Sequence, residues 1–265
     1  MENLIQTIQE IPKDKSVFVF DLDGTLAESK VNIDSEMGDL LAQLLVKGKV
    51  AIIGGASFKQ MASQLPESIS KNSNLFLLPL DGGSFYKYPS TSSGQVQNDS
   101  WQEVYKHELS LLQKKGITEA LARSSLEAGY LTPAKTYGTT VEDRGSQVTW
   151  SALGQEAPLE EKQKWNQSEN GLRLKIVTKL KEYLPNMESR VAGLTSIDVT
   201  PKGIDKKYGV EQIIKHLNVS AADVLFFGDT LEPEGNDYPA LEARVACYMV
   251  SSVEDTKKAI EYLLD

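Results

Sequence analysis

Two carboxylates follow an apolar stretch near the N-terminus. Residues Val17–Phe20 have the composition of a buried strand, and Asp21 and Asp23 come directly after them. A single aspartate after a strand is usually part of a turn or a helix cap. Two aspartates separated by one residue, at the end of a buried strand, favour a chemical role instead.

A second pair of carboxylates follows another apolar stretch near the C-terminus. The stretch Val224–Phe227 precedes the segment GDTLEPEGND, which contains Asp229 and Asp237. Ligands of open α/β sheets bind at the carboxyl ends of the strands, so both pairs are expected at one edge of a sheet. Crowded carboxylates raise one another's pKa unless a cation lies among them. With only oxygen ligands nearby, that cation would be a hard ion, and Mg²⁺ is the usual choice.

These acids must be positioned by a sheet, and the sequence predicts one. Helical patterns separate several short apolar stretches that are bounded by turn residues, as is typical of buried parallel strands. The stretches are 17–20, 50–53, 75–78, 224–227 and 246–250. The alternation predicts an α/β fold, with a Rossmann-like parallel sheet sandwiched by helices.

The middle of the chain has a different pattern. After a polar, turn-rich stretch at 88–95, the apolar residues of 101–112 are spaced as on a helix. Half-exposed strands are expected at 141–153 and 191–200, with a helix at 171–184 between them. This mixture predicts an inserted α+β cap domain. The expected boundaries are 1–88 with 203–265 for the discontinuous core domain, and 89–202 for the cap domain.

The composition argues against several classes of protein. The 265 residues carry a net charge of -9, whereas a nucleic-acid partner requires a basic surface. No apolar run approaches the ~18 residues of a membrane span, so no membrane partner is expected. The one cysteine, Cys247, cannot form an intramolecular disulfide, which favours a cytoplasmic protein. The two histidines make a histidine-based metal site or a catalytic triad a poor hypothesis.

Three segments resemble motifs of the haloacid dehalogenase superfamily of aspartyl phosphotransferases: DLDGTL, GIDKKYG and FFGDTLEPEGND. The resemblance implies that Asp21 is the nucleophile that accepts the phosphoryl group and that Asp23 is the general acid and base. It implies that Lys206 offsets the charge on Asp21 and on the transferring group. It also implies a Mg²⁺ site formed by Asp21, the backbone carbonyl of Asp23 and Asp229, with Asp237 either as a further ligand or as a residue that supports the ligands.

The remaining superfamily motif is a serine or threonine after a second strand. The segment IIGGASF places Gly55 and Ser57 in this region as candidate phosphate-binding residues. Ser57 also begins a Ser-x-x-Gln capping box that ends at Gln60, so a simple helix cap is the alternative interpretation. One residue can serve both purposes, because helix N-termini bind anions.

Within the superfamily, the chain is similar to the eukaryotic-type phosphomannomutase branch, whose cap is of type IIB and selects the substrate. The segments IIGGASF, EDRGSQVTWSALGQ and SIDVTPKGIDKKY carry this resemblance, which runs from residue 17 nearly to the C-terminus. Strand alternation over 191–200 places Ser196 and Asp198 on one face, where they would bind sugar hydroxyls. A solvated sheet face is the alternative interpretation.

The chain departs from this branch at the residues that bind the two ends of a bisphosphorylated hexose. The branch uses four arginines, of which this chain keeps Arg144, while Lys30, Lys162 and Gln155 occupy the other positions. Lysine keeps the charge but loses the bidentate fork, and glutamine loses both. A mutase must hold the distal phosphate while its intermediate turns over, whereas a phosphatase need not.

The sequence therefore predicts a Mg²⁺-dependent phosphotransferase that interconverts mannose 1-phosphate and mannose 6-phosphate, with a hexose 1,6-bisphosphate as activator. A sugar-phosphate phosphatase that uses the same residues is the alternative. A receiver-like switch phosphorylated on aspartate is a distant one, because receivers are about half this length and lack a cap. The resemblance also implies a homodimer formed through the cap, and the apolar residues around Trp101 and Leu109 are either its surface or part of a core.

Overall fold

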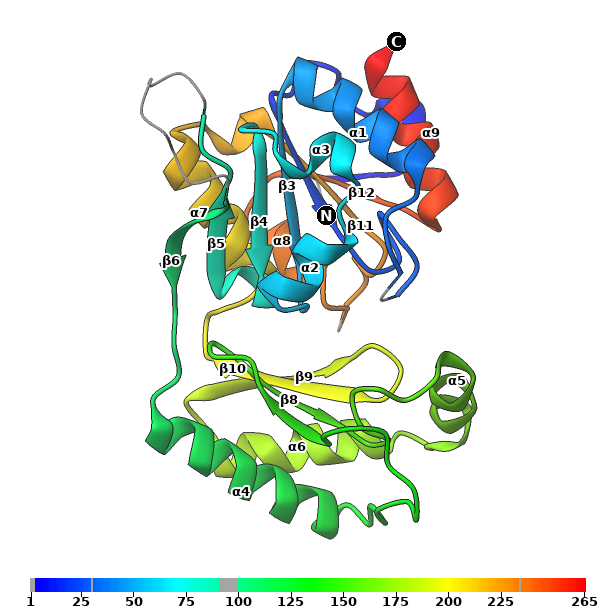
Figure 1. Cartoon of the computed structure of the whole chain (residues 1–265), viewed down its shortest axis with the longest axis vertical. Coiled ribbons are helices and arrows are strands. Elements are labelled where there is room, and N and C mark those ends of the chain that lie inside the picture. Colours follow the sequence, from blue (N-terminus) through cyan, green and yellow to red (C-terminus); the bar gives the residue numbers. More distant parts are fainter. Residues whose placement is uncertain (1–2, 30, 91–99, 234) are drawn as a thin grey trace. The chain divides into compact units, whose positions relative to one another are not determined.

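The computed structural model describes residues 3–29, 31–90, 100–233 and 235–265. The chain forms two compact units (Figure 1). The first, called the core unit, comprises Met1–Lys106 and Asp205–Asp265. The second, called the inserted unit, comprises His107–Ile204. Each unit has its own sheet and its own apolar core.

The described residues of the core unit contain an eight-stranded sheet in the order β1-β12-β11-β2-β3-β4-β5-β6. Neighbouring strands are parallel from β1 to β4 and antiparallel from β4 to β6. The strands are β1 (Leu4–Ile5), β2 (Val17–Asp21), β3 (Lys49–Gly54), β4 (Leu75–Pro79), β5 (Ser84–Lys87), β6 (Gln102–Lys106), β11 (Val224–Gly228) and β12 (Ala246–Met249). All the strands predicted for the core are present, and β2, β4 and β11 are buried at every residue, as in a parallel sheet covered on both faces.

Helices cover both faces of this sheet. Successive side chains of a strand point to opposite faces, so Phe18 and Phe20 belong to one apolar cluster, and Val17 and Val19 to the other. The first cluster includes residues of α1 (Ser35–Lys47), α2 (Phe58–Gln64), α3 (Glu67–Ser70) and α9 (Val253–Leu264), and the second includes residues of α7 (Lys206–Leu217) and α8 (Tyr238–Glu242). Short 3-10 helices lie at Ile8–Glu10, Leu80–Gly82 and Ala221–Asp223. This arrangement is the predicted α/β sandwich.

In its described residues, the inserted unit contains a four-stranded antiparallel sheet in the order β7-β8-β10-β9 (Figure 1). The strands are β7 (Val141–Asp143), β8 (Val148–Ser151), β9 (Met187–Ala192) and β10 (Ser196–Pro201), and the helices are α4 (Leu111–Glu127), α5 (Leu159–Ser168) and α6 (Leu172–Tyr183). Ile197 and Val199 of β10 pack into one core with Ile117 of α4 and Ile176 of α6. Helices α4 and α6 therefore cover one face of the sheet. Among the described residues, no helix combines the length and the apolar character needed to cross a membrane.

The segment from Trp101 to Leu112 differs from the helix expected there. Residues Gln102–Lys106 form strand β6, which pairs with β5, and α4 begins only after that strand. The aromatic side chains give the physical reason, because Tyr105 packs edge-on against Phe85 of β5 with ring centroids 5.8 Å apart. Aromatic residues suit a half-buried strand, and cross-strand aromatic pairs stabilise it.

Strand β6 also changes where the inserted unit begins. Residues 100–106 belong to the core unit, so the inserted unit starts later than the expected boundary at residue 89. The apolar residues around Trp101 and Leu109 do not form one surface, because Trp101 packs against the core unit and Leu109 lies in the apolar core of the inserted unit. Of the two interpretations of these residues, part of a core is therefore the one that the structure supports.

The stacked pair Phe20 and Phe227 provides a test of the core. Both side chains are fully buried, and their ring centroids lie 4.6 Å apart across β2 and β11. We expect Phe20→Ala to lower the free energy of unfolding by about 3–5 kcal/mol, because it removes a large buried side chain and leaves a cavity. Urea denaturation measures this loss. Val46→Ala, at a position that is 89% exposed, is the control and should change stability by less than about 0.5 kcal/mol.

Candidate active site

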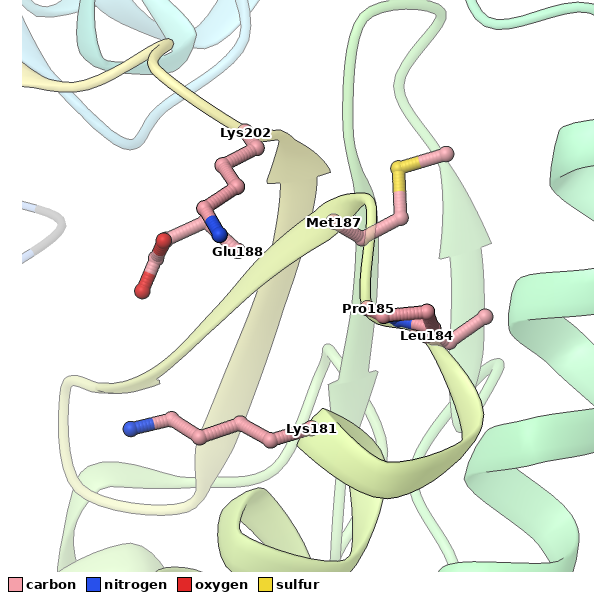
Figure 2. A pocket seen from close by; sticks show the side chains of 6 residues that line it. All are labelled: Lys181, Leu184, Pro185, Met187, Glu188 and Lys202. Carbon is pink, nitrogen blue, oxygen red and sulfur yellow. The ribbon is translucent and has the colours of Figure 1, made fainter.

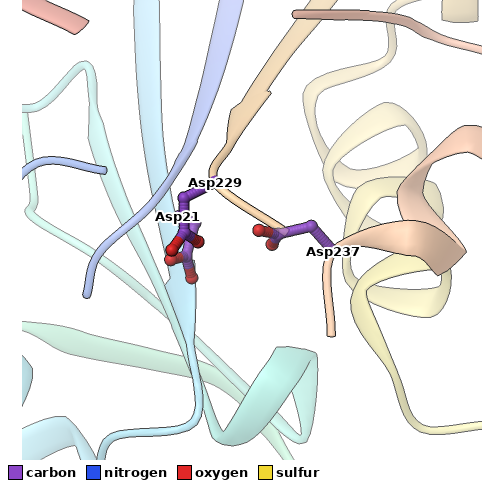
Figure 3. Close-up of side chains that lie close together, drawn as sticks. All are labelled: Asp21, Asp229 and Asp237. Carbon is purple, nitrogen blue, oxygen red and sulfur yellow. The ribbon is translucent and has the colours of Figure 1, made fainter. Parts of the chain in front are cut away.

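Among the described residues, three carboxylates converge at the carboxyl edge of the core sheet (Figure 3). Asp21 ends β2, Asp229 follows the neighbouring strand β11, and Asp237 immediately precedes α8. One oxygen from each carboxylate lies within 4.8 Å of the others. Asp21 and Asp237 are 3% and 0% exposed, and Asp229 is half-buried. The parallel pairing of β2 with β11 is what brings distant segments of the chain to one edge.

Two glycines leave the space that these carboxylates occupy. Gly24 has a φ of +91°, a conformation that side-chain-bearing residues rarely adopt, and a Cβ atom there would clash with the carboxylate of Asp229. A Cβ atom at Gly228 would clash with the carboxylate of Asp237. The DLDGTL and FFGD segments therefore need glycine so that the acids can approach one another.

Lys206 is buried among the carboxylates. It is the first residue of α7, its side chain is 0% exposed, and its ammonium donates hydrogen bonds to the carboxylates of Asp21 and Asp237. Its third acceptor is Asn236 Oδ1, at 3.1 Å. Helix α7 can come this close because Gly209 packs against Ile53 of β3, where any side chain would clash. The structure thus places the lysine beside the candidate nucleophile.

Burial raises the pKa of two of the carboxylates, whereas neighbouring charges raise the pKa of the lysine. Burial raises the pKa of Asp21 well above its usual value; the charge of Lys206 opposes this rise, and the charges of Asp237 and Asp229 add to it. Burial, reinforced by the charge of Asp237, raises the pKa of Asp229 to about 6. Burial alone would lower the pKa of Lys206, but the charges of Asp21 and Asp237 outweigh it and raise that pKa above its usual value. Lys206 therefore stays an ammonium, while Asp21 and Asp229 resist ionisation more than ordinary aspartates do.

The donor set fits a divalent cation. When the three carboxylates are ionised and Lys206 is protonated, the cluster carries two negative charges, which one divalent ion balances. All the side-chain ligands are oxygens, as Mg²⁺ prefers. The side chain of Asp23 is not a member of this cluster, and its backbone carbonyl stays a predicted ligand.

Thr230 and Asn236 belong to the site, although the sequence alone did not indicate them. The Thr230 hydroxyl lies 2.9 Å from Asn236 Oδ1 and 3.0 Å from Asp237 Oδ2, and the Thr230 backbone amide donates to Asp237 Oδ2 at 3.1 Å. These bonds close the loop between β11 and α8. Thr230 thereby fixes the two residues that contact Lys206 from this loop. Thr230 and Asn236 both lie within the GDTLEPEGND segment, and their position beside Asp229 and Asp237 is the sequence signal that could have identified them.

The other candidate residues of the core unit follow β3 or lie outside the described residues. Ile53 of β3 pairs with Asp21, so Gly55 and Ser57, which follow β3, lie toward the same edge of the sheet. The Ser57 hydroxyl accepts a hydrogen bond from the Gln60 amide at 3.4 Å and caps α2, and its role with phosphate stays a prediction. Lys30 lies outside the described residues.

Three of the candidate substrate-binding residues meet in the inserted unit. Arg144 Nη2 donates to Gln155 Oε1 at 3.3 Å, and Lys162 Nζ donates to the Gln155 carbonyl at 3.3 Å. Glu142, which the sequence did not indicate, forms an ion pair with Arg144 at 2.8 Å. The charge of Arg144 is therefore partly neutralised within the protein.

Ser196 and Asp198 lie on the face of the inserted sheet that α4 and α6 do not cover, in agreement with the strand alternation. Asp198 Oδ1 accepts a hydrogen bond from the Thr149 hydroxyl at 2.7 Å. The Thr149 oxygen accepts in turn from Gln147 Nε2 at 2.9 Å. This chain of bonds fixes the direction of the Thr149 proton, and it depends on a cross-strand pairing that is not visible in the sequence.

A hollow of about 360 Å³ lies elsewhere in the inserted unit, at the turn between α6 and β9 (Figure 2). Its lining includes Lys181, Met187, Glu188 and Lys202. None of the described residues predicted for the site lines it. The hollow has no evident part in the chemistry of the carboxylate cluster.

Solved structures define the class of the fold. The chain is similar to a haloacid dehalogenase-like hydrolase from Bacteroides thetaiotaomicron, with a TM-score of 0.60 and 15% identity over 93% of this chain and 98% of that one. It is also similar to the IMP-nucleotidase of Plasmodium falciparum, with a TM-score of 0.66 and 14% identity over 97% of this chain and 70% of that one. The predicted haloacid dehalogenase fold is confirmed.

Sequence comparison defines the family. The family model for eukaryotic phosphomannomutase matches residues 37–265, and the chain belongs to this family. It is 28% identical to a phosphomannomutase of Encephalitozoon cuniculi, over 95% of this chain and 94% of that protein. It is also 28% identical to human phosphomannomutase 1, over 92% of this chain and 90% of that protein. The predicted class of enzyme, a haloacid dehalogenase phosphotransferase, is confirmed.

Thr230→Val tests the role of the loop between β11 and α8. The change removes the hydroxyl beside Asn236 and Asp237, and we expect kcat/KM to fall about tenfold, since a hydrogen bond to a charged group contributes about 1.5 kcal/mol. The concentration of Mg²⁺ that gives half-maximal activity should rise as well. Thr178→Val, which removes an exposed hydroxyl from α6, is the control. Unchanged kinetics and metal dependence in Thr230→Val would show that the loop is held without this hydroxyl.

The raised pKa of Asp229 predicts that the effect of Mg²⁺ depends on pH. Because this pKa is about 6 in the fold, against an ordinary value of 3.8, the metal-free protein should lose stability as the pH rises through this interval. Mg²⁺ should oppose the loss by pairing with the ionised carboxylate. The rise in unfolding temperature on adding Mg²⁺ should thus be larger at about pH 7.5 than at about pH 5. In Asp229→Asn this pH dependence should become weaker, although Asp21 keeps its raised pKa, and an unchanged pH dependence would contradict the assignment.

Proposed function

We propose that the chain transfers phosphoryl groups between hexose phosphates through Asp21, as a phosphomannomutase that interconverts mannose 1-phosphate and mannose 6-phosphate. One observation carries the proposal: Asp21 converges with Asp229, Asp237 and the buried Lys206 in a member of the eukaryotic phosphomannomutase family. A buried nucleophilic carboxylate, a lysine that stays charged and a set of oxygen ligands are what phosphoryl transfer to an aspartate requires.

The residues of the core unit divide the reaction into two transfers. In the first, a carboxylate oxygen of Asp21 bonds to phosphorus as the bond from phosphorus to the sugar oxygen breaks, and Asp23 donates a proton to that oxygen. In the second, Asp23 accepts a proton from the attacking hydroxyl, which takes the phosphoryl group from Asp21. Lys206 holds one oxygen of Asp21 and offsets the charge that collects around the phosphoryl group.

The proposal includes a bound Mg²⁺. Asp21, Asp229 and Asp237 would hold it, together with the backbone carbonyl of Asp23. A bound Mg²⁺ supplies positive charge between the anionic nucleophile and the anionic phosphoryl group, whose mutual repulsion would otherwise slow the reaction. Gly55 and Ser57 are proposed to bind phosphate oxygens beside it.

The inserted unit is proposed to select the substrate, in the manner of a cap domain. Ser196 and Asp198 would bind sugar hydroxyls, because they lie on the face of the sheet that is free of helices. The distal anionic group would be bound by Arg144, Lys162 and Gln155, which lie together, and by Lys30. A hexose 1,6-bisphosphate would act as activator by supplying the first phosphoryl group to Asp21.

One observation favours a second candidate function, a sugar-phosphate phosphatase. Arg144 is paired with Glu142, and Gln155 and Lys162 occupy positions where the resemblance to the family implies arginine. A bisphosphate that is held less firmly is more often released or hydrolysed before it reorients in the site. In that case water, rather than a sugar hydroxyl, would take the phosphoryl group from Asp21.

The proposal also includes a cytoplasmic location and a homodimer formed through the inserted unit. Cys247 is free and buried, which is compatible with a reducing compartment. Leu111 and Leu112 at the start of α4 are 85% and 81% exposed, and apolar side chains of this kind are common at protein interfaces.

The products formed by the wild-type protein and by Asp21→Asn test the proposed function. Wild-type protein, supplied with mannose 1-phosphate, Mg²⁺ and a hexose 1,6-bisphosphate, should form mannose 6-phosphate and some free phosphate. Asp21→Asn should lose nearly all of both products, because an amide is a poor nucleophile and a poor metal ligand. Free phosphate with no mannose 6-phosphate would identify a phosphatase, and near-normal turnover by Asp21→Asn would contradict transfer through this residue.

A further inference from the structure

The face of the inserted sheet that lies opposite α4 and α6 carries a row of polar and charged side chains. Glu142 of β7 pairs with Thr149 of β8, Thr149 pairs with Asp198 of β10, and Asp198 pairs with Arg190 of β9. Residues directly paired across antiparallel strands point to the same face of a sheet. Arg190 therefore shares its face with Asp198, a proposed ligand of sugar hydroxyls.

The neighbours of Arg190 in β9 confirm the direction of its side chain. Met187 and Val191 pack against the apolar core formed with α4 and α6. Successive side chains of a strand point to opposite faces, so Arg190, next to Val191, points away from that core. Its side chain is half-buried rather than extended fully into solvent.

We propose that Arg190 is a further anion-binding residue of the inserted unit and determines the preference for sugar phosphates that carry a second anionic group. This inference rests on the proposed function of the same site. Arg144, one of the cations proposed to bind that group, is partly neutralised by Glu142 at 2.8 Å, and Gln155 beside it carries no charge. Arg190, which stands opposite the carboxylate of Asp198, adds a second guanidinium at another position of the same sheet, and a guanidinium has more N–H donors than one carboxylate can take.

The geometry allows one ligand to contact Asp198 and Arg190 together. The Cβ atoms of directly paired residues lie about 4.5–5.5 Å apart, so a sugar that binds Asp198 through a hydroxyl lies within reach of the guanidinium. Arginine has five N–H donors in a planar fork, and a carboxylate can take two of them, which leaves others for a phosphate. Asp198 Oδ1 accepts the Thr149 hydroxyl at 2.7 Å, which holds this carboxylate on the polar face.

Arg190→Gln removes the charge, and Arg123→Gln is the matched control. Arg123 lies on α4, and its side chain is 65% exposed, so the control removes the same charge from the helical side of the same unit. We expect Arg190→Gln to lower kcat/KM for a hexose 1,6-bisphosphate about tenfold, mainly through KM, and to leave turnover of an aryl phosphate unchanged. Arg123→Gln should change neither.

Direct binding gives a second measurement. In an Asp21→Asn background, which does not turn over, calorimetry should show about a tenfold rise in the Kd of the bisphosphate when Arg190→Gln is added. Arg190→Lys, which keeps the charge without the fork, should fall between wild type and Arg190→Gln. If Arg190→Gln does not fold, an unchanged Kd in Arg190→Lys overturns the proposal.

The outcomes separate this proposal from the proposed function. Equal losses on the bisphosphate and on the aryl phosphate, or no loss on either, would show that Arg190 only stabilises the sheet, and the proposal would be overturned. A wild-type protein that turns over the aryl phosphate but no sugar phosphate would instead contradict the proposed function. A selective loss on the bisphosphate, absent from Arg123→Gln, supports the assignment of Arg190.

Discussion

The structure depends on the cost of bringing three carboxylates within 4.8 Å of one another at a buried sheet edge. Lys206 offsets part of this charge, and the rest calls for a divalent cation or for retained protons. Several features of the core unit serve this one constraint: the adjacency of β2 and β11, the two glycines beside the carboxylates, and the close approach of α7 to β3. The stability of the core and its capacity for phosphoryl transfer are therefore linked.

The inserted unit solves a different physical problem. Its sheet is apolar on the face that packs against α4 and α6, and polar on the other face, where charged side chains lie in register across the strands. Substitutions on the polar face of the inserted unit can thus leave the carboxylate cluster of the core unit unchanged. Arg144 pairs with Glu142, and Arg190 stands opposite Asp198. The inserted unit has therefore not only lost arginines but carries its charges at different positions.

Local sequence patterns predicted the parts of the fold that local physics determines. The buried strands, the acids at their ends and the two faces of β10 all follow from short apolar runs and strand alternation. Strand β6 was missed because the spacing of Trp101 and Tyr105 also fits a helix. The packing of Tyr105 against Phe85, which favours the strand, is not visible in the local sequence. Thr230 was missed because its contacts depend on how a loop closes, and Arg190 was missed because its position opposite Asp198 depends on cross-strand register; neither follows from apolar runs.

The central claim is that the phosphoryl group is carried by Asp21, and chemical trapping tests it most directly. The protein would be mixed with Mg²⁺ and a hexose 1,6-bisphosphate, treated with borohydride, and digested for mass spectrometry. Borohydride reduces an acyl phosphate to an alcohol, so Asp21 should be converted into homoserine, and only when both Mg²⁺ and the bisphosphate are present. Conversion of a different residue, or no conversion in a protein that is turning over, would contradict the account.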